Sequence, residues 1–307
     1  MVIITMEVMK LNFIKKHKIL TVILLLLSFY LYLNFTKFNN YERNYDTKGK
    51  NYINELYKSD NRVYETVLND KQKKMYSQII KEAKAHSTKT IIDLEKFDCA
   101  DHRECGDLID IATSAIWVDH PELMNFAGYR WSYRNGELIL RIDYAYTFPI
   151  QDYIGILRIE NIVSKIKEAT KNMSDKEKII YVYNWMGRNN YYDKTFMFDS
   201  KNQSIYNVFV RGNAVCAGFA KASHIIFSQI GIESYIVEGI STGPHMWNIV
   251  KYKDKFYFFD STVAVSINEG YTDYHYEGLK QSFLNSYTIS YPNWYPKVES
   301  ENMFKID

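Results

Sequence analysis

The sequence lacks the features that mark several classes of protein. It has only three cysteines among 307 residues, and its formal net charge is +2. So small a charge argues against binding of nucleic acid through a basic face. We find no internal repeat, no phosphate-binding loop and no calcium-binding loop, and we expect no cofactor. With 47% hydrophobic residues, the chain has enough apolar material for one large or two modest globular units.

Two of the cysteines lie close together, as Cys99 and Cys105, with His102 between them. This spacing fits no standard zinc-binding pattern well. Three alternatives therefore stay open: a local disulfide, two unpaired thiols, or a metal site that includes His102. In an exported protein, a disulfide between Cys99 and Cys105 would leave Cys216 as the free thiol.

Residues 1–36 have the pattern of a short cytoplasmic segment followed by a signal anchor. The basic residues at 15–18 precede a charge-free apolar run at 19–35, which is at the lower limit of length for one membrane span. The lysines predict a cytoplasmic N-terminus and place the rest of the chain outside the cell membrane. No convincing cleavage site follows, which favours an uncleaved anchor; secretion after signal cleavage is the alternative.

Between this anchor and the C-terminal region, we expect a stalk and a small α+β module. Residues 37–70 are polar and read as a membrane-proximal stalk with some helix. The module, residues 71–155, has a strong hairpin signal at Asn135-Gly136. The elements expected in it are two helices and the two arms of the hairpin: residues 71–85, 107–119, 129–134 and 137–146.

Residues 156–307 form the expected C-terminal domain. An amphipathic helix is predicted at 156–169, and Ser174-Asp-Lys-Glu177 has the pattern of a capping box that opens the next helix. After residue 262 the chain contains aromatic segments that we expect to form strands and complete a sheet. They include Tyr274, Tyr276, Phe283 and Tyr287.

Cys216 stands at the start of a predicted helix. The apolar residues after it recur at helical spacing: Phe219, Ala222, Ile226 and Ile230. Gly231 is well placed as the C-terminal stop. The free N–H groups and the positive dipole end of a helix start favour a thiolate, and the same amides could stabilise an oxyanion.

Two strand-like runs, residues 245–252 and 255–260, are joined by Lys253-Asp254. If this is a two-residue hairpin, His245 lies diagonally from Asp260 on one face of the sheet, at roughly 7–8 Å between backbones. A three-residue turn would put the two side chains on opposite faces. The pairing of His245 with Asp260 therefore depends on the register.

A thiol, an imidazole and a carboxylate are the three parts of an acyl-transferring cysteine enzyme. Each residue also has an ordinary structural interpretation: a cysteine at a helix start is usually a small buried hydrophobe, and a histidine beside a tryptophan often packs. We interpret His224, two turns after Cys216, as such a packing histidine. The joint order of Cys216, His245 and Asp260 favours a catalytic triad.

From about residue 175 to residue 262, the sequence resembles the transglutaminase-like superfamily, in particular its membrane-anchored bacterial members. The resemblance is carried by a helix ending in Asn-x-x-Tyr-Asp193, by Arg211-Gly212, by Cys216, by His245-x-Trp247-Asn248 and by Asp260-Ser-Thr262. The sequence departs from the family pattern at Ala214, where a glycine is usual. If that glycine has a positive φ, alanine would strain the turn before Cys216.

The resemblance implies a papain-related α+β fold in which the helix bearing the nucleophile packs on an antiparallel sheet. It implies that Cys216 is the nucleophile, His245 the acid and base, and Asp260 its orienting partner. The Cys216 backbone amide is the expected oxyanion donor, with Tyr206 or Trp247 as side-chain candidates. The expected reaction is acyl transfer on protein or peptide amides in the cell envelope, through a thioester, giving crosslinking or hydrolysis. The alternative is a catalytically silent envelope or binding protein that keeps the fold.

Overall fold

A computed structural model describes Val22, Tyr57 and residues 61–146, 150–195, 200–267 and 286–299. The chain divides into two compact units, Met1–Tyr52 and Ile53–Asp307, and all elements below belong to the second unit. No helix within the described ranges is long and apolar enough to cross a membrane. The predicted anchor at residues 19–35 lies outside those ranges except for Val22, which is helical and exposed.

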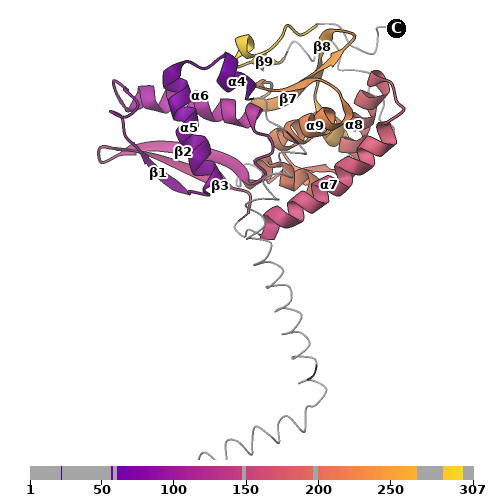
Figure 1. Cartoon of the computed structure of the whole chain (residues 1–307), viewed down its shortest axis with the longest axis horizontal. Coiled ribbons are helices and arrows are strands. Elements are labelled where there is room, and N and C mark those ends of the chain that lie inside the picture. The colour runs from indigo at the N-terminus through magenta and orange to yellow at the C-terminus, as the bar shows by residue number, and fades with distance from the viewer. Residues whose placement is uncertain are drawn as a thin grey trace, which may run out of the picture. The chain divides into compact units, whose positions relative to one another are not determined.

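The N-terminal part of the second unit combines helices with a three-stranded antiparallel sheet of order β1-β3-β2. Helix α5 packs against helix α6 (Figure 1). The elements are α4 (Arg62–Thr66), α5 (Asp70–Lys84), β1 (Lys89–Ile92), α6 (His102–Asp119), β2 (Phe126–Arg134) and β3 (Glu137–Tyr144). Val63 and Leu68 are buried, so the end of the segment expected as a stalk is part of the folded unit.

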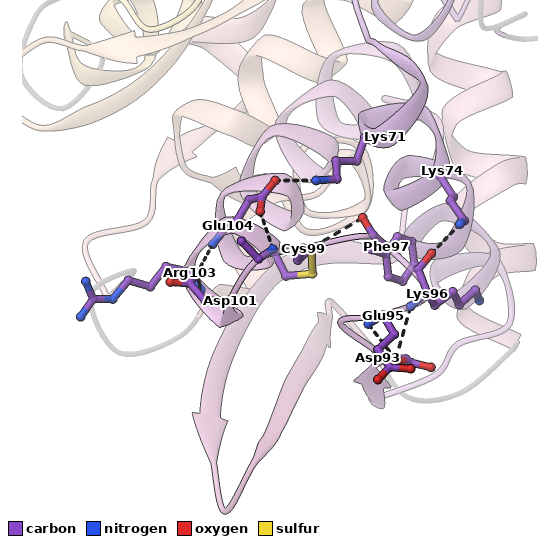
Figure 2. Close-up of a disulfide and its surroundings, with 12 residues drawn as sticks. Lys71, Lys74, Asp93, Glu95, Lys96, Phe97, Cys99, Asp101, Arg103 and Glu104 are labelled. Carbon is purple, nitrogen blue, oxygen red and sulfur yellow. Dashed lines mark hydrogen bonds and ion pairs between the residues drawn. A yellow bond between two sulfur atoms is a disulfide. The ribbon is translucent and has the colours of Figure 1, made fainter.

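The predicted hairpin is confirmed, and one predicted helix begins earlier than expected. Arg134 pairs with Glu137, while Asn135 and Gly136 have φ values of 53° and 83°, as a two-residue turn with left-handed backbone requires. Helix α6 begins at His102 and not near residue 107. The reason is Asp101, whose carboxylate accepts hydrogen bonds from the first-turn amides of Arg103 and Glu104 (Figure 2).

The C-terminal part is built on a four-stranded antiparallel sheet of order β8-β7-β6-β9. Helix α9 packs against β6 and β7, which confirms the predicted helix on an antiparallel sheet. The helices and strands are α7 (Ile150–Thr170), α8 (Asp175–Asn189), β4 (Tyr191–Tyr192), β5 (Asn213–Ala214), α9 (Cys216–Ile230), β6 (Ser234–Ile240), β7 (Pro244–Tyr252), β8 (Lys255–Phe259), α10 (Ser261–Ile267) and β9 (Thr288–Ile289). Short 3₁₀-helices span Ser200–Gln203 and Pro292–Trp294, and a π-helix spans Asn207–Arg211.

Several local predictions for this part hold. The helix predicted at 156–169 begins earlier, at Ile150 of α7, and the prediction for the chain after residue 262 holds only in part. The Ser174 capping box is present, and Gly231 ends α9 with a φ of 78°. After Asp260 the chain first forms helix α10, and then β9 pairs with the edge of β6. Of the predicted aromatic segments, those with Tyr274, Tyr276 and Phe283 lie outside the described residues.

A hydrophobic cluster joins the two parts of the second unit. It includes Ile109 and Ile116 of α6, Ala217 and Ala220 of α9, and Ile236 of β6. Ala217 and Ala220 belong to the first two turns of α9, which begins at Cys216. The start of α9 therefore belongs to the same buried cluster as α6.

Candidate active site

The only unpaired cysteine within the described ranges, Cys216, is the first residue of α9 and is partly exposed. The preceding residue, Val215, is the N-cap, and its side chain caps no amide. The first-turn N–H groups therefore receive no hydrogen bond from an N-cap side chain, so these donors and the positive end of the helix dipole lie beside the sulfur.

The turn before Cys216 is close-packed without backbone strain. Ala214, where the family pattern has glycine, lies in the short strand β5 and is not among the residues with positive φ; Gly212 takes the left-handed conformation, with φ 73°. A Cβ added at Gly218 would lie 2.9 Å from the Ala214 Cβ and 3.1 Å from the Ser204 carbonyl oxygen. Small residues at 214 and 218 thus allow the turn to pack against the first turn of α9.

Asp193 braces this turn. Its Oδ2 accepts hydrogen bonds from the Asn202 side chain at 2.6 Å and from the Asn213 side chain at 3.3 Å. Its backbone N–H donates to the Ala214 carbonyl at 2.9 Å, and the Asn202 carbonyl accepts from the Val215 N–H at 3.2 Å. One carboxylate therefore links three segments that meet just before the nucleophile.

The predicted register of the β7–β8 hairpin is confirmed, and it brings His245 and Asp260 together. Tyr252 pairs with Lys255 across the two-residue turn, and the ladder continues to Asn248 and Phe259. Asp260 follows directly after β8. The Nε2 of His245 lies 2.7 Å from Oδ2 of Asp260.

The Asp260 carboxylate is almost fully buried, with 1% of the residue exposed. Its Oδ1 accepts from the Thr262 N–H at 2.8 Å. Its Oδ2 accepts from His245 and also from the Tyr287 hydroxyl, at 2.9 Å. Both oxygens are thus held by donors, which fixes the direction in which the carboxylate faces the imidazole.

His245 contacts the Asp260 carboxylate, and both Asp260 and Cys216 influence its pKa. Burial lowers its pKa, but the hydrogen bonds to Asp260 and to Cys216 outweigh burial and raise the pKa to about 10. Because Nε2 donates to Asp260, Nδ1 is the nitrogen left for Cys216. An imidazolium is therefore favoured beside the sulfur, and such a cation stabilises a thiolate.

The two side-chain candidates for the oxyanion donor, Tyr206 and Trp247, lie in different surroundings. The Tyr206 ring is buried against the Tyr146 ring, with centroids 4.6 Å apart, and Arg211 lies 5.5 Å from its centre. The Trp247 ring is buried and stacks on His245 at 5.8 Å, where it shields the imidazole from water.

Tyr192 is a neighbour of the thiol that the sequence reasoning did not single out. Burial raises the pKa of Tyr192 to about 12, and negative charge at Cys216 and Asp260 adds to the effect. The residue belongs to β4 and pairs with Ala214, two residues before the nucleophile. The signal that could have found it is the Tyr-Asp pair at the end of the family motif, which precedes the bracing carboxylate of Asp193.

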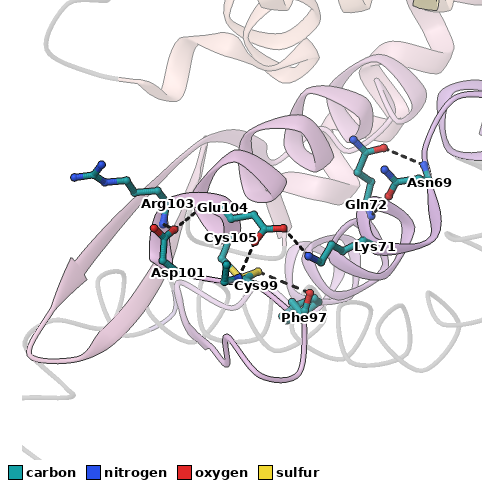
Figure 3. Close-up of polar contacts among 10 residues, drawn as sticks. Asn69, Lys71, Gln72, Phe97, Cys99, Asp101, Arg103, Glu104 and Cys105 are labelled. Atoms are coloured by element: carbon teal, nitrogen blue, oxygen red, sulfur yellow. Dashed lines mark hydrogen bonds and ion pairs between the residues drawn. A yellow bond between two sulfur atoms is a disulfide. The ribbon is translucent and has the colours of Figure 1, made fainter.

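The other two cysteines form a disulfide, Cys99–Cys105, at the start of α6. Beside it the Glu104 carboxylate accepts from Lys71 at 2.5 Å and from the Ala100 N–H at 2.7 Å (Figure 3). His102 stacks on Tyr133, with ring centroids 4.1 Å apart. Within the described ranges, no group of three or more His, Cys, Asp or Glu residues is placed to hold a metal ion.

A partly exposed thiol at a helix start, an imidazole and a buried carboxylate that contacts the imidazole are the parts of a cysteine acyl-transfer site. Residues 161–261 match the transglutaminase-like superfamily. The chain therefore carries a transglutaminase-like domain, and Cys216, His245 and Asp260 all lie within it.

Solved structures show similarity at low sequence identity. A TGase structure shares 18% identity with a TM-score of 0.34, over 52% of this chain and 49% of that one. A proposed cysteine protease from Cytophaga hutchinsonii shares 11% identity with a TM-score of 0.32, over 53% and 65%. The periplasmic domain of TgpA from Pseudomonas aeruginosa shares 12% with a TM-score of 0.26, over 43% and 58%. The chain thus covers about half of the TGase. No curated protein matches the sequence.

Proposed function

We propose that this protein transfers acyl groups from protein or peptide amides through a thioester at Cys216. The observation that carries the proposal is the contact between His245 and Asp260, whose Nε2 and Oδ2 lie 2.7 Å apart, next to a thiol at Cys216 that raises the pKa of the same imidazole. The match of residues 161–261 to the transglutaminase-like superfamily supports the same chemistry.

In the first half of the reaction, the Cys216 thiolate attacks the amide carbonyl carbon and a C–S bond forms. The negative charge that develops on the carbonyl oxygen faces the Cys216 backbone N–H at the start of α9. Tyr192 is a further candidate for a side-chain donor, because it pairs with Ala214, two residues before the nucleophile. The C–N bond then breaks, and Nδ1 of His245 gives its proton to the leaving amine.

In the second half, an amine or water attacks the thioester while His245 takes the proton of the attacking group. The C–S bond breaks, and the thiolate is restored beside an imidazolium. An amine gives an isopeptide crosslink, and water gives hydrolysis. Exclusion of water decides between these outcomes, and the buried Trp247 ring over His245 limits access of water from one side.

The test is incubation with a glutamine-containing peptide and a labelled primary amine. We expect a thioester on Cys216 by mass spectrometry, followed either by incorporation of the amine or by release of ammonia or peptide fragments. Incorporation identifies a crosslinking enzyme, and release without incorporation identifies a hydrolase. Cys216→Ala should abolish all of these products.

A catalytically silent fold would behave differently towards a thiol-directed alkylator. In the proposed enzyme, Cys216 reacts rapidly at neutral pH, and the reaction slows in His245→Ala because the imidazolium is lost. Slow alkylation in the wild type, unchanged in His245→Ala, would contradict the enzymatic assignment and leave the fold with a binding role.

We also propose that the domain acts outside the cell membrane, held by an uncleaved anchor at residues 19–35. The Cys99–Cys105 disulfide supports this location, because disulfides persist in oxidising compartments and are rare in the cytosol. Protease added to intact spheroplasts should degrade the domain, whereas a cytoplasmic marker survives. Protection of the domain in spheroplasts, with degradation only after lysis, would contradict the proposed location.

A further inference from the structure

Asp260 accepts a hydrogen bond from a side chain outside the set of Cys216, His245 and Asp260. The oxygen that faces His245, Oδ2, also accepts from the Tyr287 hydroxyl at 2.9 Å. Tyr287 belongs to the segment 286–299, beyond the residues that match the transglutaminase-like superfamily, which end at 261. The site of this chain therefore includes a contribution from outside the matched domain.

The Tyr287 ring also covers the residues that it bonds. Its centroid lies 5.6 Å from that of His245 and 5.0 Å from that of Trp247, and it meets Phe258 edge-on at 4.6 Å. The rings of His245, Trp247 and Tyr287 therefore form one cluster in which each ring lies beside the other two. Such packing removes water from the hydrogen bond between His245 and Asp260 and so strengthens it.

The pairing of β9 with β6 places Tyr287 beside His245 and Asp260. Tyr287 directly precedes β9, in which Ile289 pairs with Gly239 and Thr288 pairs with Ile240 of β6. A Cβ at Gly239 would lie only 2.1 Å from the Thr288 carbonyl oxygen. A side chain there would displace β9, so the glycine permits the close approach that holds Tyr287 over the site.

We propose that Tyr287 is a positioning residue of the active site, whose hydroxyl fixes the Asp260 carboxylate and whose ring closes over the His245–Asp260 pair. Burial and the Asp260 charge raise the pKa of Tyr287, so the phenol stays protonated and remains a donor. The role rests on the acyl transfer proposed above, since a carboxylate held on both oxygens keeps the imidazole aligned while protons move.

The test compares Tyr287→Phe, which keeps the ring and removes the hydroxyl, with Tyr291→Phe as the matched control. Tyr291 comes from the same segment, but its ring stacks on Trp294, with ring centroids 4.1 Å apart. We expect Tyr287→Phe to lower kcat about tenfold with KM unchanged, which corresponds to one hydrogen bond to a charged group lost in the transition state. Tyr291→Phe should leave kcat and KM unchanged.

A second readout needs no substrate and separates this role from the proposed reaction. In Tyr287→Phe, the His245 Nε2 proton should move downfield in the NMR spectrum, because Asp260 Oδ2 then accepts from His245 alone. If the wild type shows no turnover but this shift occurs, the positioning role stands and the proposed reaction fails. An unchanged proton resonance and kcat in Tyr287→Phe, or equal changes in Tyr291→Phe, would overturn the assignment.

Discussion

Helices α6 and α9 both begin beside a cysteine, but their N-termini are organised in opposite ways. At α6 the Asp101 carboxylate caps two first-turn amides, and Cys105, fully buried, is tied to Cys99. At α9 the N-cap is Val215, which caps nothing, and Cys216 is free and partly exposed.

The difference separates a structural helix start from a reactive one. At a capped N-terminus the first-turn N–H groups are hydrogen-bonded, and the cap contributes to stability. At an uncapped N-terminus these N–H groups and the positive end of the helix dipole remain available to a bound or developing anion. The same contrast holds for the sulfur atoms, since a disulfide removes the nucleophile that a free thiol supplies. Variants at each helix start should therefore change either stability or reactivity, and not both.

The largest effect is expected at the reactive site. His245→Ala should lower kcat/KM by about 10³-fold or more, because no group remains to deprotonate Cys216 or to protonate the leaving amine. His102→Ala is the control, since His102 opens α6 and stacks on Tyr133. The measurement is steady-state kinetics with the glutamine peptide. A comparable loss of activity in His102→Ala would break the distinction between the two helix starts.

The next effect concerns stability alone. Replacing both Cys99 and Cys105 with serine should lower the free energy of unfolding by about 2 kcal/mol, the value for a short closed loop, here with a sequence separation of 6. Denaturant titration gives this value. The alkylation rate of Cys216 in the folded variant should equal that of the wild type, and a changed rate would show that the α6 start influences the reactive site.

Much of the reactive site could be predicted because its signals are local. The helical spacing after Cys216 and the stop at Gly231 gave the bounds of α9. The two-residue turn gave the β7–β8 register, since Lys253 and Asp254 both adopt positive φ, 46° and 62°, as such a turn requires. The contact between His245 and Asp260 follows from that register.

Other features depend on contacts that no local pattern reveals. Tyr287 reaches Asp260 because β9 pairs with β6 at Gly239, which is a long-range event. Sequence order does not single out Tyr192 among the tyrosines, because its place next to the turn before Cys216 comes from the pairing of β4 with β5. The early start of α6 depends on the Asp101 side chain, which accepts hydrogen bonds from the first-turn amides of α6. The helical spacing of apolar residues does not by itself locate this start.

A smaller effect is expected from the two histidines as pH changes. Burial and the Arg62 charge lower the pKa of His224 from 6.5 to about 4, so the unfolded chain binds a proton there more readily than the folded one. Its contribution to stability is therefore present above pH 6.5 and declines as pH falls towards about 4. For His245 the pH dependence has the opposite sign. The contribution of His245 to stability is fully present below pH 6.5 and is lost as pH rises to about 10.

Unfolding free energies measured across this pH range in the wild type, His224→Gln and His245→Gln test both signs. The acid decline should flatten in His224→Gln, and the alkaline decline should flatten in His245→Gln. His224 lies 2.8 Å from both Ser234 Oγ and the Tyr57 hydroxyl, so glutamine retains polar contact there. An acid decline that persists unchanged in His224→Gln would assign it to another group.

The smallest effect should come from opening the capped helix start. Hydrogen bonds from the Glu104 and Arg103 amides hold the pKa of Asp101 below its ordinary value of 3.8. The cap therefore stabilises the fold above that pH and is lost as pH falls through the lowered pKa. Asp101→Ala should lower Tm slightly at neutral pH, by less than loss of the disulfide does, and the difference in Tm from the wild type should vanish in acid.

The alkylation rate of Cys216 should stay unchanged in this variant. The substitution frees amides only at the start of α6, where no thiol lies beside a histidine–carboxylate pair. Slower alkylation in Asp101→Ala would mean that the two helix starts are coupled through the shared hydrophobic cluster.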